Sequence, residues 1–288
     1  TCGEPTLTQT GGRLAVGVEE LDVWLLPPPD SPRDVPGHEL DDRERERAEA
    51  YRRPEDRRMY LAAHVGLRRV LSVYTGLEPH RITLGGERHG GDGERHGRPV
   101  VLGVPGAPQF SLSHSHGLAL VVVSGVRVGA DVQRVPSRET TEACLPTLHP
   151  LEREELSARG EPARTAAFGR LWTRKEAYLK GLGTGLARGA DRDYLGEGRP
   201  AARPVGWVVG NLPLCPTHIG AAALLGSGDR QVVMRAVGAE HLYARDAVER
   251  LRAMPPGLRS VLRDVNRGAD REGTAPARGD GRALAPGR

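Results

Sequence analysis

Apolar residues recur along the chain with two spacings, one typical of strands and the other typical of helices. Apolar runs or alternation predict strands at 21–26, 118–123, 126–133, 205–209 and 231–237, with a weaker pattern at 220–225. Helical spacing predicts helices at 40–51, 55–74 and 164–180, followed by amphipathic pieces at 239–253 and 258–265. The glycine-rich segment 85–99 is expected to be a loop, and the tail from 267 onward to be disordered.

The strand predicted at 126–133 carries polar residues on only one of its faces. Its apolar face consists of Val126, Val128, Ala130 and Val132. The opposite face includes Asp131 and Gln133, which therefore point the same way from a half-buried strand. Taken alone, an acid in this position is more typical of a solvated residue or an ion-pair partner than of a functional group.

Charged residues flank the apolar stripe of the helix predicted at 164–180. The stripe consists of Phe168, Leu171, Trp172 and Leu179. At about 100° per residue, Lys175 lies on one flank of it, and Glu176 and Lys180 lie on the other. Lysines beside a carboxylate suit a site that holds Mg²⁺ and phosphates together. The helix is expected to end at the glycines that follow it, Gly181, Gly183 and Gly185.

The segment 110–116 reads Phe-Ser-Leu-Ser-His-Ser-His and is predicted to be a serine-rich turn before a buried strand. Ser113 and His114 offer a hydroxyl and an imidazole to an anion. A polar loop in which the histidine caps a carbonyl is an alternative. A role as a hydrolase nucleophile is disfavoured, because the serines lack the Gly-x-Ser-x-Gly context. A metal site at His114 and His116 is disfavoured, because no further ligands lie nearby in sequence.

Composition and charge narrow the classes of protein. The net charge is only +4, so anion binding must come from local clusters. One such cluster consists of basic residues on the helix predicted at 55–74 and just before it. These are Arg52, Arg53, Arg57, Arg58, Arg68 and Arg69. They raise a nucleic-acid-binding module as an alternative function, although no such motif is present and aromatic residues make up only 4%.

The cysteines and the hydropathy of the chain predict the cellular compartment of the protein. The three cysteines share no metal-ligand spacing, which favours a reducing cytoplasm over a disulfide framework. No apolar run reaches the length of a membrane span, and no leader pattern opens the chain. We therefore expect a soluble cytoplasmic protein that binds neither membranes nor nucleic acid.

Four blocks in a fixed order resemble the signatures of the 4′-phosphopantetheinyl transferase superfamily. The blocks are Gly97-Arg-Pro, Phe110-Ser-Leu-Ser-His-Ser, Val128-Gly-Ala-Asp-Val-Gln and Trp172-Thr-Arg-Lys-Glu-Ala-Tyr-Leu-Lys-Gly-Leu-Gly-Thr-Gly-Leu. The Trp-x-x-Lys-Glu-Ala block is the most specific of the four. The resemblance covers about 21–237 and is closest to the long, monomeric branch, which serves carrier domains of polyketide and nonribosomal-peptide synthases.

The resemblance implies a fold and a division of the chain. It implies an α+β fold of two similar subdomains related by a pseudo-two-fold axis, with coenzyme A in the cleft between them. The expected divisions are an N-terminal half at 1–124, a C-terminal half at 125–238, and a helical and disordered tail at 239–288.

The resemblance also implies roles for individual residues. Asp131, Gln133 and Glu176 would hold Mg²⁺, and Glu176, directly or through water or Lys180, would accept the proton of the attacking hydroxyl. The residues assigned to coenzyme A are Arg53, Arg58, Arg98, Ser113, His114, Lys175 and Lys180. Of these, Arg98 would anchor the nucleotide end, and the two lysines would neutralise the pyrophosphate.

The implied reaction transfers the phosphopantetheine group of coenzyme A to a serine of an apo carrier protein. The serine attacks the β-phosphorus, and 3′,5′-adenosine bisphosphate leaves, with Mg²⁺ as cofactor. One departure concerns Gln133, since many relatives have an acid there. A neutral amide adds no charge to a metal site, so a coenzyme A-binding homologue with weak or no transferase activity is the alternative.

Overall fold

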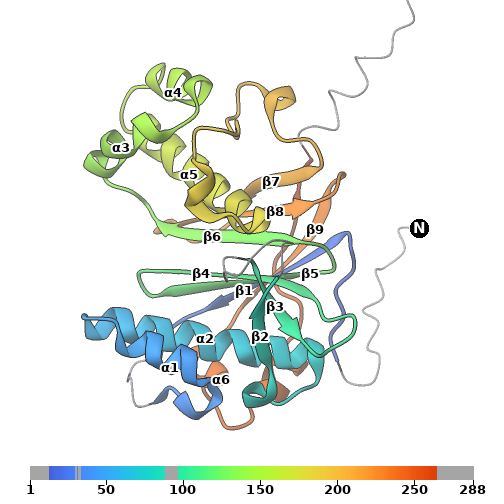
Figure 1. The fold of residues 1–288 in the computed structure, drawn as a ribbon. Coiled ribbons are helices and arrows are strands. Elements are labelled where there is room, and N and C mark those ends of the chain that lie inside the picture. The colour runs from blue at the N-terminus through green and yellow to red at the C-terminus, as the bar shows by residue number, and fades with distance from the viewer. Residues whose placement is uncertain (1–12, 30, 32–33, 88–96, 265–288) are drawn as a thin grey trace, which may run out of the picture.

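Two β-sheets stack face to face in the middle of the molecule, and helices cover their outer sides (Figure 1). The computed structural model describes residues 13–29, 31, 34–87 and 97–264. Within these residues the layers run in the order helix, sheet, sheet, helix, so the fold is α+β as expected.

The larger sheet has five strands in the order β10-β9-β1-β5-β4. Their bounds are Arg259–Leu262 for β10, Arg230–Ala236 for β9, Glu20–Leu26 for β1, Leu118–Ser124 for β5 and Gln109–Ser115 for β4. β1 runs parallel to β9, and the other neighbours are antiparallel. The sheet therefore joins strands from both ends of the described chain.

Helix α2 (Pro54–Thr75) covers the outer face of this sheet (Figure 1). Proline at its first position and a left-handed Gly76 after its last turn define its ends. The core between helix and sheet includes Trp24, Leu71 and Phe110. Helices α1 (Asp42–Glu49), α6 (Ala239–Leu242) and α7 (Ala247–Ala253) complete this layer.

The smaller sheet has three strands in the order β6-β8-β7. Their bounds are Val128–Arg134 for β6, His218–Leu225 for β8 and Trp207–Leu212 for β7. Helix α5 (Ala163–Leu182) packs on its outer face through Phe168 and Leu171, and α3 (Arg138–Cys144) and α4 (Pro150–Ser157) lie beside α5. The inner faces of both sheets share one core, which includes Leu120, Val132 and Leu224.

A two-stranded ribbon and short 3₁₀ helices connect these layers. The ribbon pairs β2 (Thr83–Gly86) with β3 (Pro99–Leu102). The 3₁₀ helices are at Gly37–Glu39, Pro79–Arg81, Leu145–Thr147, Gly185–Arg188 and Pro200–Ala202. No helix in the described part of the chain is long and apolar enough to cross a membrane.

The structure corrects four expectations of local structure. The segment 110–116 is mostly strand β4 instead of a turn, because its alternate residues face different layers. Part of 258–265 forms strand β10, because it pairs with β9. Gly181 lies inside α5, which ends at Gly183 in the left-handed region. Segment 85–99 carries ends of β2 and β3, while 88–96 and the tail from 267 lie outside the described residues.

The sheets do not follow the expected boundaries at 124 and 238. β9 lies within the expected C-terminal half and β10 within the expected tail, yet both extend the sheet that contains β1. The parallel pairing of β1 with β9 joins residues about two hundred positions apart, and local sequence patterns carry no signal for such a pairing.

Strand β6 is buried on both faces and not on one face only. Val128, Ala130 and Val132 share one face, as expected, and pack in the core between the two sheets. The other face lies under α5, so Asp131 is only 1% exposed. The polar face of the strand is therefore an internal surface.

Candidate active site

The backbones of α5 and β6 touch at two glycines. A Cβ atom at Gly129 would lie 2.1 Å from the carbonyl oxygen of Ala177 and 2.2 Å from the backbone nitrogen of Gly181. Only residues without a side chain permit this approach. It places one turn of α5, which carries Glu176 and Lys180, directly over Asp131.

Lys180 and Asp131 form an ion pair at this contact. The Nζ atom of Lys180 lies 2.7 Å from Oδ1 of Asp131 and 2.9 Å from Oγ of Ser113. Gln133 donates from Nε2 to the other carboxylate oxygen, Oδ2, at 3.1 Å. The Asp131 side chain is 2% exposed and that of Lys180 is 32% exposed, so the pair lies at the border of a solvent-accessible space.

Glu176 lies one helical turn before Lys180, and its side chain has no hydrogen bond or ion pair with any described residue. Burial and the charge of Asp131 raise the pKa of its carboxyl, and Lys180 acts in the opposite direction. Two neighbouring carboxylates and the amide oxygen of Gln133 are hard oxygen donors. Mg²⁺ takes one or two carboxylates and completes its shell with phosphate oxygens and water.

The residues present therefore fit a magnesium ion that a phosphate group helps to bind. Among the described residues, no group of three or more histidine, cysteine and acidic side chains could hold a metal without such help. This donor set suits an ion that arrives together with a phosphorylated substrate.

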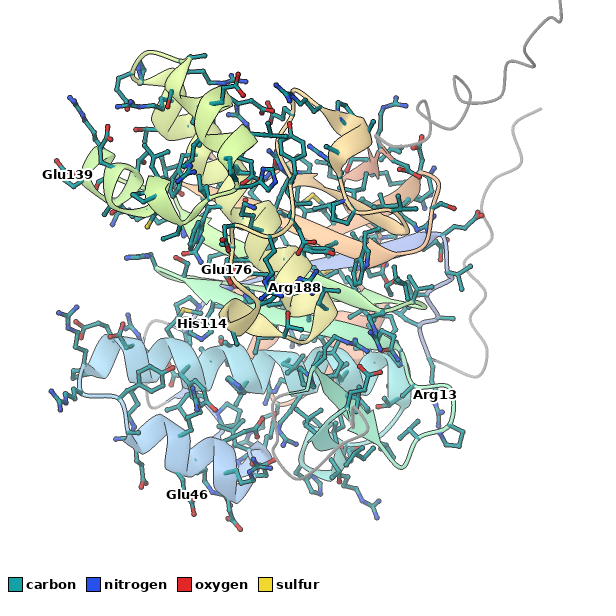
Figure 2. All side chains as sticks on the ribbon, turned by 45° about the horizontal axis from the view of Figure 1, so that its top comes forward. Arg13, Glu46, His114, Glu139, Glu176 and Arg188 are labelled. Atoms are coloured by element: carbon teal, nitrogen blue, oxygen red, sulfur yellow. The ribbon has the colours of Figure 1, made fainter. Side chains whose placement is uncertain are left out.

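A cleft of about 970 Å³ opens beside these residues. Its lining comes from α1, α2, the β2-β3 ribbon, β4 and the end of α5, and it includes Tyr60, His64, Arg98, His114 and Lys180. Figure 2 shows Glu176 and His114 near the middle of the molecule, where α5 approaches α2. Burial and the nearby Lys180 lower the pKa of His114. The ring centroids of His114 and Tyr60 lie 6.5 Å apart in an edge-to-face arrangement.

Arg98 brings a buried positive charge to the wall of this cleft. The residue is 4% exposed, and its Nη2 donates to Oε1 of Gln109 and lies 3.5 Å from Oε2 of Glu87. Its Nε and Nη1 atoms have no hydrogen-bond partner among the described residues. Glu87 also pairs with Arg127 at 2.9 Å, so one carboxylate faces two guanidinium groups. A buried guanidinium with unused donors is suited to an anion from outside the chain.

The structure separates Ser113 from His114. Because side chains alternate along β4, His114 faces α2 and the cleft, whereas Ser113 faces β6. Ser113 is not among the described residues that line the cleft. The two residues were expected to contact phosphates together, but they lie on opposite sides of one strand.

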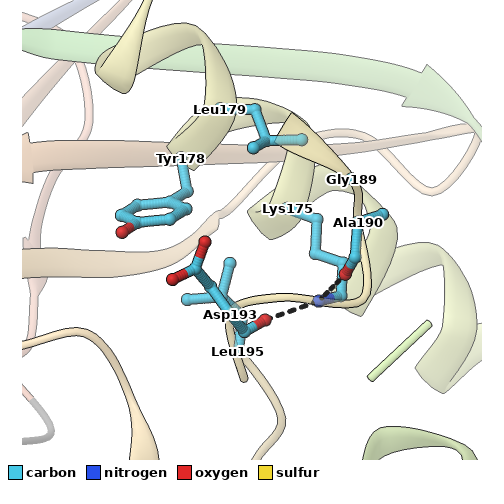
Figure 3. A pocket seen from close by; sticks show the side chains of 7 residues that line it. All are labelled: Lys175, Tyr178, Leu179, Gly189, Ala190, Asp193 and Leu195. Atoms are coloured by element: carbon cyan, nitrogen blue, oxygen red, sulfur yellow. Dashed lines mark hydrogen bonds between the residues drawn. The ribbon is translucent and has the colours of Figure 1, made fainter. Parts of the chain in front are cut away.

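Lys175 occupies a different place from the one expected. Its side chain is 3% exposed and pairs with the fully buried Glu152 at 2.8 Å. Its Nζ also donates to the carbonyl oxygens of Ala190 and Asp193, each at 2.7 Å (Figure 3). Because α4 and the segment 189–195 cover this flank of α5, Lys175 cannot neutralise a pyrophosphate in the cleft. The expectation for Lys175 is corrected on this point.

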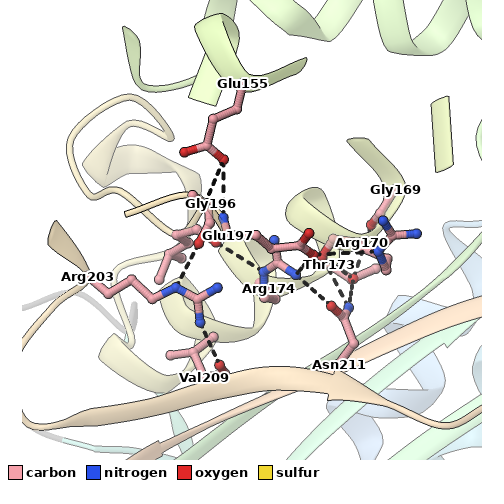
Figure 4. Close-up of polar contacts among 12 residues, drawn as sticks. Glu155, Gly169, Arg170, Thr173, Arg174, Gly196, Glu197, Arg203, Val209 and Asn211 are labelled. Atoms are coloured by element: carbon pink, nitrogen blue, oxygen red, sulfur yellow. Dashed lines mark hydrogen bonds and ion pairs between the residues drawn. The ribbon is translucent and has the colours of Figure 1, made fainter. Parts of the chain in front are cut away.

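Neighbouring side chains hold the same part of the chain. Arg174 donates to the carbonyl oxygen of Leu195, and Arg203 donates to those of Gly196 and Val209 (Figure 4). These buried cations use backbone carbonyls as acceptors. They fix the segment after α5 against the smaller sheet.

Replacing Lys175 by methionine is expected to destabilise the fold by about 3–5 kcal/mol, because Glu152 would remain as a buried unpaired charge. The measurement is urea unfolding at neutral pH. The double variant with Glu152→Leu removes both charges and should recover part of the loss. Coenzyme A affinity at 20 °C, where each variant is folded, should stay near that of the parent. A selective loss of this affinity without a loss of stability would return Lys175 to the substrate site.

The expected arginines fall into two groups. Arg53 and Arg58 lie at the start of α2 and are not among the described cleft-lining residues. Arg68 and Arg69 are buried and pair with Glu44 at 2.8 Å and with Glu39 at 2.6 Å. The basic helix face is therefore smaller than expected, which weakens the case for nucleic-acid binding.

Sequence reasoning missed an aromatic wall of the cleft. Tyr60 stacks on His64 at 3.9 Å between ring centroids, and Tyr51 lies 5.3 Å from Tyr60. Burial lowers the pKa of His64 to about 4 and raises that of Tyr60 to about 12. The spacing of four residues between Tyr60 and His64 on one helix was the available signal.

Comparison with known proteins identifies the family. The family model of the 4′-phosphopantetheinyl transferase superfamily matches residues 127–205, which contain Asp131, Glu176 and Lys180. The 4′-phosphopantetheinyl transferase HetI of Nostoc sp. (strain PCC 7120) is 33% identical over 177 residues, which cover 59% of this chain and 71% of that protein.

Two further relatives carry the same description. The putative 4′-phosphopantetheinyl transferase slr0495 of Synechocystis sp. (strain PCC 6803) is 30% identical over 59% of this chain and 68% of its own length. A 4′-phosphopantetheinyl transferase of Bacillus subtilis is 25% identical over 50% of this chain and 60% of its own length. This chain therefore belongs to the 4′-phosphopantetheinyl transferase superfamily and is an enzyme of that class.

Proposed function

We propose that this enzyme transfers the 4′-phosphopantetheine group of coenzyme A to a serine of an apo carrier protein, with Mg²⁺ as cofactor. The observation that carries the proposal is the cluster of Asp131, Glu176 and Lys180 at the border of a large cleft. The two outer helices, each on its own sheet, are consistent with two related subdomains around a pseudo-two-fold axis. The resemblance to the long branch supports action as a monomer in the cytoplasm, on carriers of polyketide or nonribosomal-peptide synthases.

The proposed reaction is a displacement at phosphorus. The carrier serine oxygen forms a bond to the β-phosphorus of coenzyme A, and the bond from that phosphorus to the bridging oxygen breaks. The bridging oxygen leaves with 3′,5′-adenosine bisphosphate and keeps the electron pair. Such reactions need positioning and charge neutralisation more than covalent chemistry from the protein.

Glu176 is proposed as the group that accepts the serine proton. Its carboxylate has no partner among the described residues, and so an incoming hydroxyl can donate to it. Burial raises the pKa of Glu176, which makes it a stronger base than an exposed glutamate. Lys180 would neutralise negative charge that builds up on the leaving group.

Asp131 and Glu176 would hold the magnesium ion, with Gln133 offering its amide oxygen. When bound, Mg²⁺ neutralises the pyrophosphate and orients it for in-line attack. In its absence, Lys180 compensates the charge of Asp131. This arrangement supports a site that is stable before the substrate brings the ion.

Arg98 and His114 are proposed to anchor coenzyme A in the cleft. Arg98 has two buried nitrogens, Nε and Nη1, with no partner in the described part of the chain, and His114 faces the same space. The aromatic wall formed by Tyr51, Tyr60 and His64 supplies apolar surface to the substrate. Arg53 and Arg58 remain as candidates for longer-range attraction of the phosphates.

Replacing Arg98 by methionine is expected to raise the dissociation constant of coenzyme A about tenfold or more, because a charged hydrogen bond to phosphate is lost. Stability should be unchanged or higher, since a guanidinium with unpaired donors leaves a buried site. Calorimetric titration with coenzyme A and with 3′-dephospho-coenzyme A measures both points. The loss should be larger for coenzyme A if Arg98 binds the 3′-phosphate. Equal affinity of parent and variant for both ligands would place the nucleotide elsewhere.

The proposed function is tested by incubating the protein with several unrelated apo carrier proteins, coenzyme A and Mg²⁺. We expect one serine of a carrier to gain the mass of phosphopantetheine and 3′,5′-adenosine bisphosphate to appear in equal amount. Chelation of the metal should stop both. A protein that binds coenzyme A but modifies no carrier, while a control transferase succeeds, would support the alternative of a binding homologue.

A further inference from the structure

Three serine side chains of β4 accept the hydrogen bonds that the free edge of β6 would otherwise give to a neighbouring strand. We refer to Ser111, Ser113 and Ser115 as the serine ladder. Their hydroxyls accept hydrogen bonds from the backbone nitrogens of Ala130 at 2.9 Å, Val132 at 3.2 Å and Arg134 at 3.1 Å. The ladder satisfies two buried donors of β6, at Ala130 and Val132, and a partly buried one at Arg134, and it joins the edges of the two sheets in a fixed register.

Ser113 differs from the other two because its hydroxyl also contacts the charged groups of the site, whereas the further partner of Ser115 is the ring of its neighbour His116 at 3.0 Å. It donates to Oδ1 of Asp131 at 2.8 Å and accepts from Nζ of Lys180 at 2.9 Å. A serine hydroxyl has one donor and two acceptor positions, and these two bonds together with that from Val132 use all three. Ser113 is also 6% exposed and faces away from the cleft wall formed by His114.

The Asp131 carboxylate is held at both of its oxygens. Ser113 donates to Oδ1, and Gln133 donates to Oδ2 at 3.1 Å. Two donors at opposite oxygens fix the plane of a carboxylate, whereas one donor leaves rotation about the last side-chain bond. Ser113 in turn is held by the backbone of β6.

We infer that Ser113 is a positioning residue that orients Asp131 for the metal and does not contact coenzyme A. This inference rests on the proposed function, in which Asp131 binds Mg²⁺ and Lys180 neutralises phosphate. When Lys180 turns toward a phosphate, it leaves Oδ1 of Asp131. Ser113 is then the remaining side-chain donor to that oxygen among the described residues.

The test compares Ser113→Ala with Ser115→Ala, which removes the same type of ladder bond without touching Asp131. Three quantities are measured: the thermal midpoint, the dissociation constant of coenzyme A in EDTA by calorimetry, and the dissociation constant of Mn²⁺ for the coenzyme A complex by electron paramagnetic resonance. Both variants should lose thermal midpoint, because each removes the acceptor of one backbone N–H of β6; the loss should be larger for Ser113→Ala, whose donor at Val132 is buried, than for Ser115→Ala, whose donor at Arg134 is only partly buried. Both should keep coenzyme A affinity within about twofold, since neither loses a phosphate contact.

Only Ser113→Ala should weaken Mn²⁺ binding, by about tenfold, as expected when a hydrogen-bond partner of a metal ligand is lost. A fall of about fivefold or more in coenzyme A affinity in EDTA, specific to Ser113→Ala, would show a direct phosphate contact and overturn the inference. Equal Mn²⁺ affinity of the two variants would also overturn it. If Ser113→Ala does not fold, Ser113→Thr restores the hydroxyl and should bind Mn²⁺ like the parent; a tenfold loss there would count against the inference.

These readouts do not depend on turnover. If the parent modifies no carrier while the Mn²⁺ difference is found, the proposed transfer fails and the role of Ser113 in orienting Asp131 stands. If the parent transfers phosphopantetheine and the two variants bind Mn²⁺ equally, the proposed transfer stands and the role of Ser113 in orienting Asp131 fails.

Discussion

Replacing Glu176 by glutamine is expected to lower the turnover number by roughly 100-fold to 10,000-fold, the usual range for loss of a general base. The change keeps the volume of the side chain and removes one negative charge and one proton acceptor. Because no described residue forms a hydrogen bond or ion pair with the Glu176 side chain, the substitution leaves no described partner unsatisfied. Stability should therefore stay within about 1 kcal/mol of the parent, as for a substitution that breaks no buried contact.

The measurement is the initial rate of carrier modification at saturating coenzyme A, Mg²⁺ and carrier. Glu154→Gln is a matched control, since Glu154 is an exposed glutamate on α4 whose side chain is 70% exposed. The control should keep the rate of the parent. A Glu176→Gln enzyme within about tenfold of the parent, which corresponds to roughly 1.4 kcal/mol in the barrier, would show that Glu176 is neither base nor metal ligand.

Replacing Asp131 by asparagine is expected to abolish detectable transfer, with a loss of at least about 100-fold that added Mg²⁺ does not restore. The carboxylate accepts hydrogen bonds at both oxygens, from Lys180 and Ser113 on one side and from Gln133 on the other. An amide carries no charge and has only one oxygen, so Lys180 loses its counter-ion and the hydrogen bonds on one of these sides must rearrange. Asp131 is 1% exposed, and the loss should cost about 1–3 kcal/mol of stability.

Transfer rate over a range of Mg²⁺ concentrations and urea unfolding give the two measurements. Asp246→Asn serves as the control for loss of an aspartate charge, because Asp246 lies at the surface in a pair with Arg250 at 2.7 Å. If excess Mg²⁺ returns Asp131→Asn to the parental rate, Asp131 only tunes metal affinity. If stability falls but the rate at each concentration is kept, Asp131 is a structural residue.

Local periodicity was enough to predict which side chains share the face that we propose as catalytic. Glu176 and Lys180 are four residues apart on one helix, and Asp131 and Gln133 are two apart on one strand. The periods of 3.6 and 2 residues are properties of the backbone, so residues at these spacings share a face before any packing occurs. The order of the motifs then indicated the family, which the comparisons confirmed.

Burial of individual side chains could not be predicted in the same way. Lys175 has the character of a surface lysine in the sequence, but Glu152 and the segment 189–195 cover its flank of α5. Arg68 likewise looked like part of a basic surface, yet Glu44 lies 24 positions away and pairs with it in the interior. Partners so distant in sequence leave no local pattern.

The sequence by itself determined which residues share a face of α5 and β6, because that depends only on the geometry of one helix or one strand. Tertiary structure alone decided that Ser113 faces β6 while His114 faces the cleft, that β9 and β10 join the sheet of β1, and that Arg98 is buried with donors that no described residue uses. The physical reason is that each of these features requires contact between segments whose distance is set by the packing of whole layers.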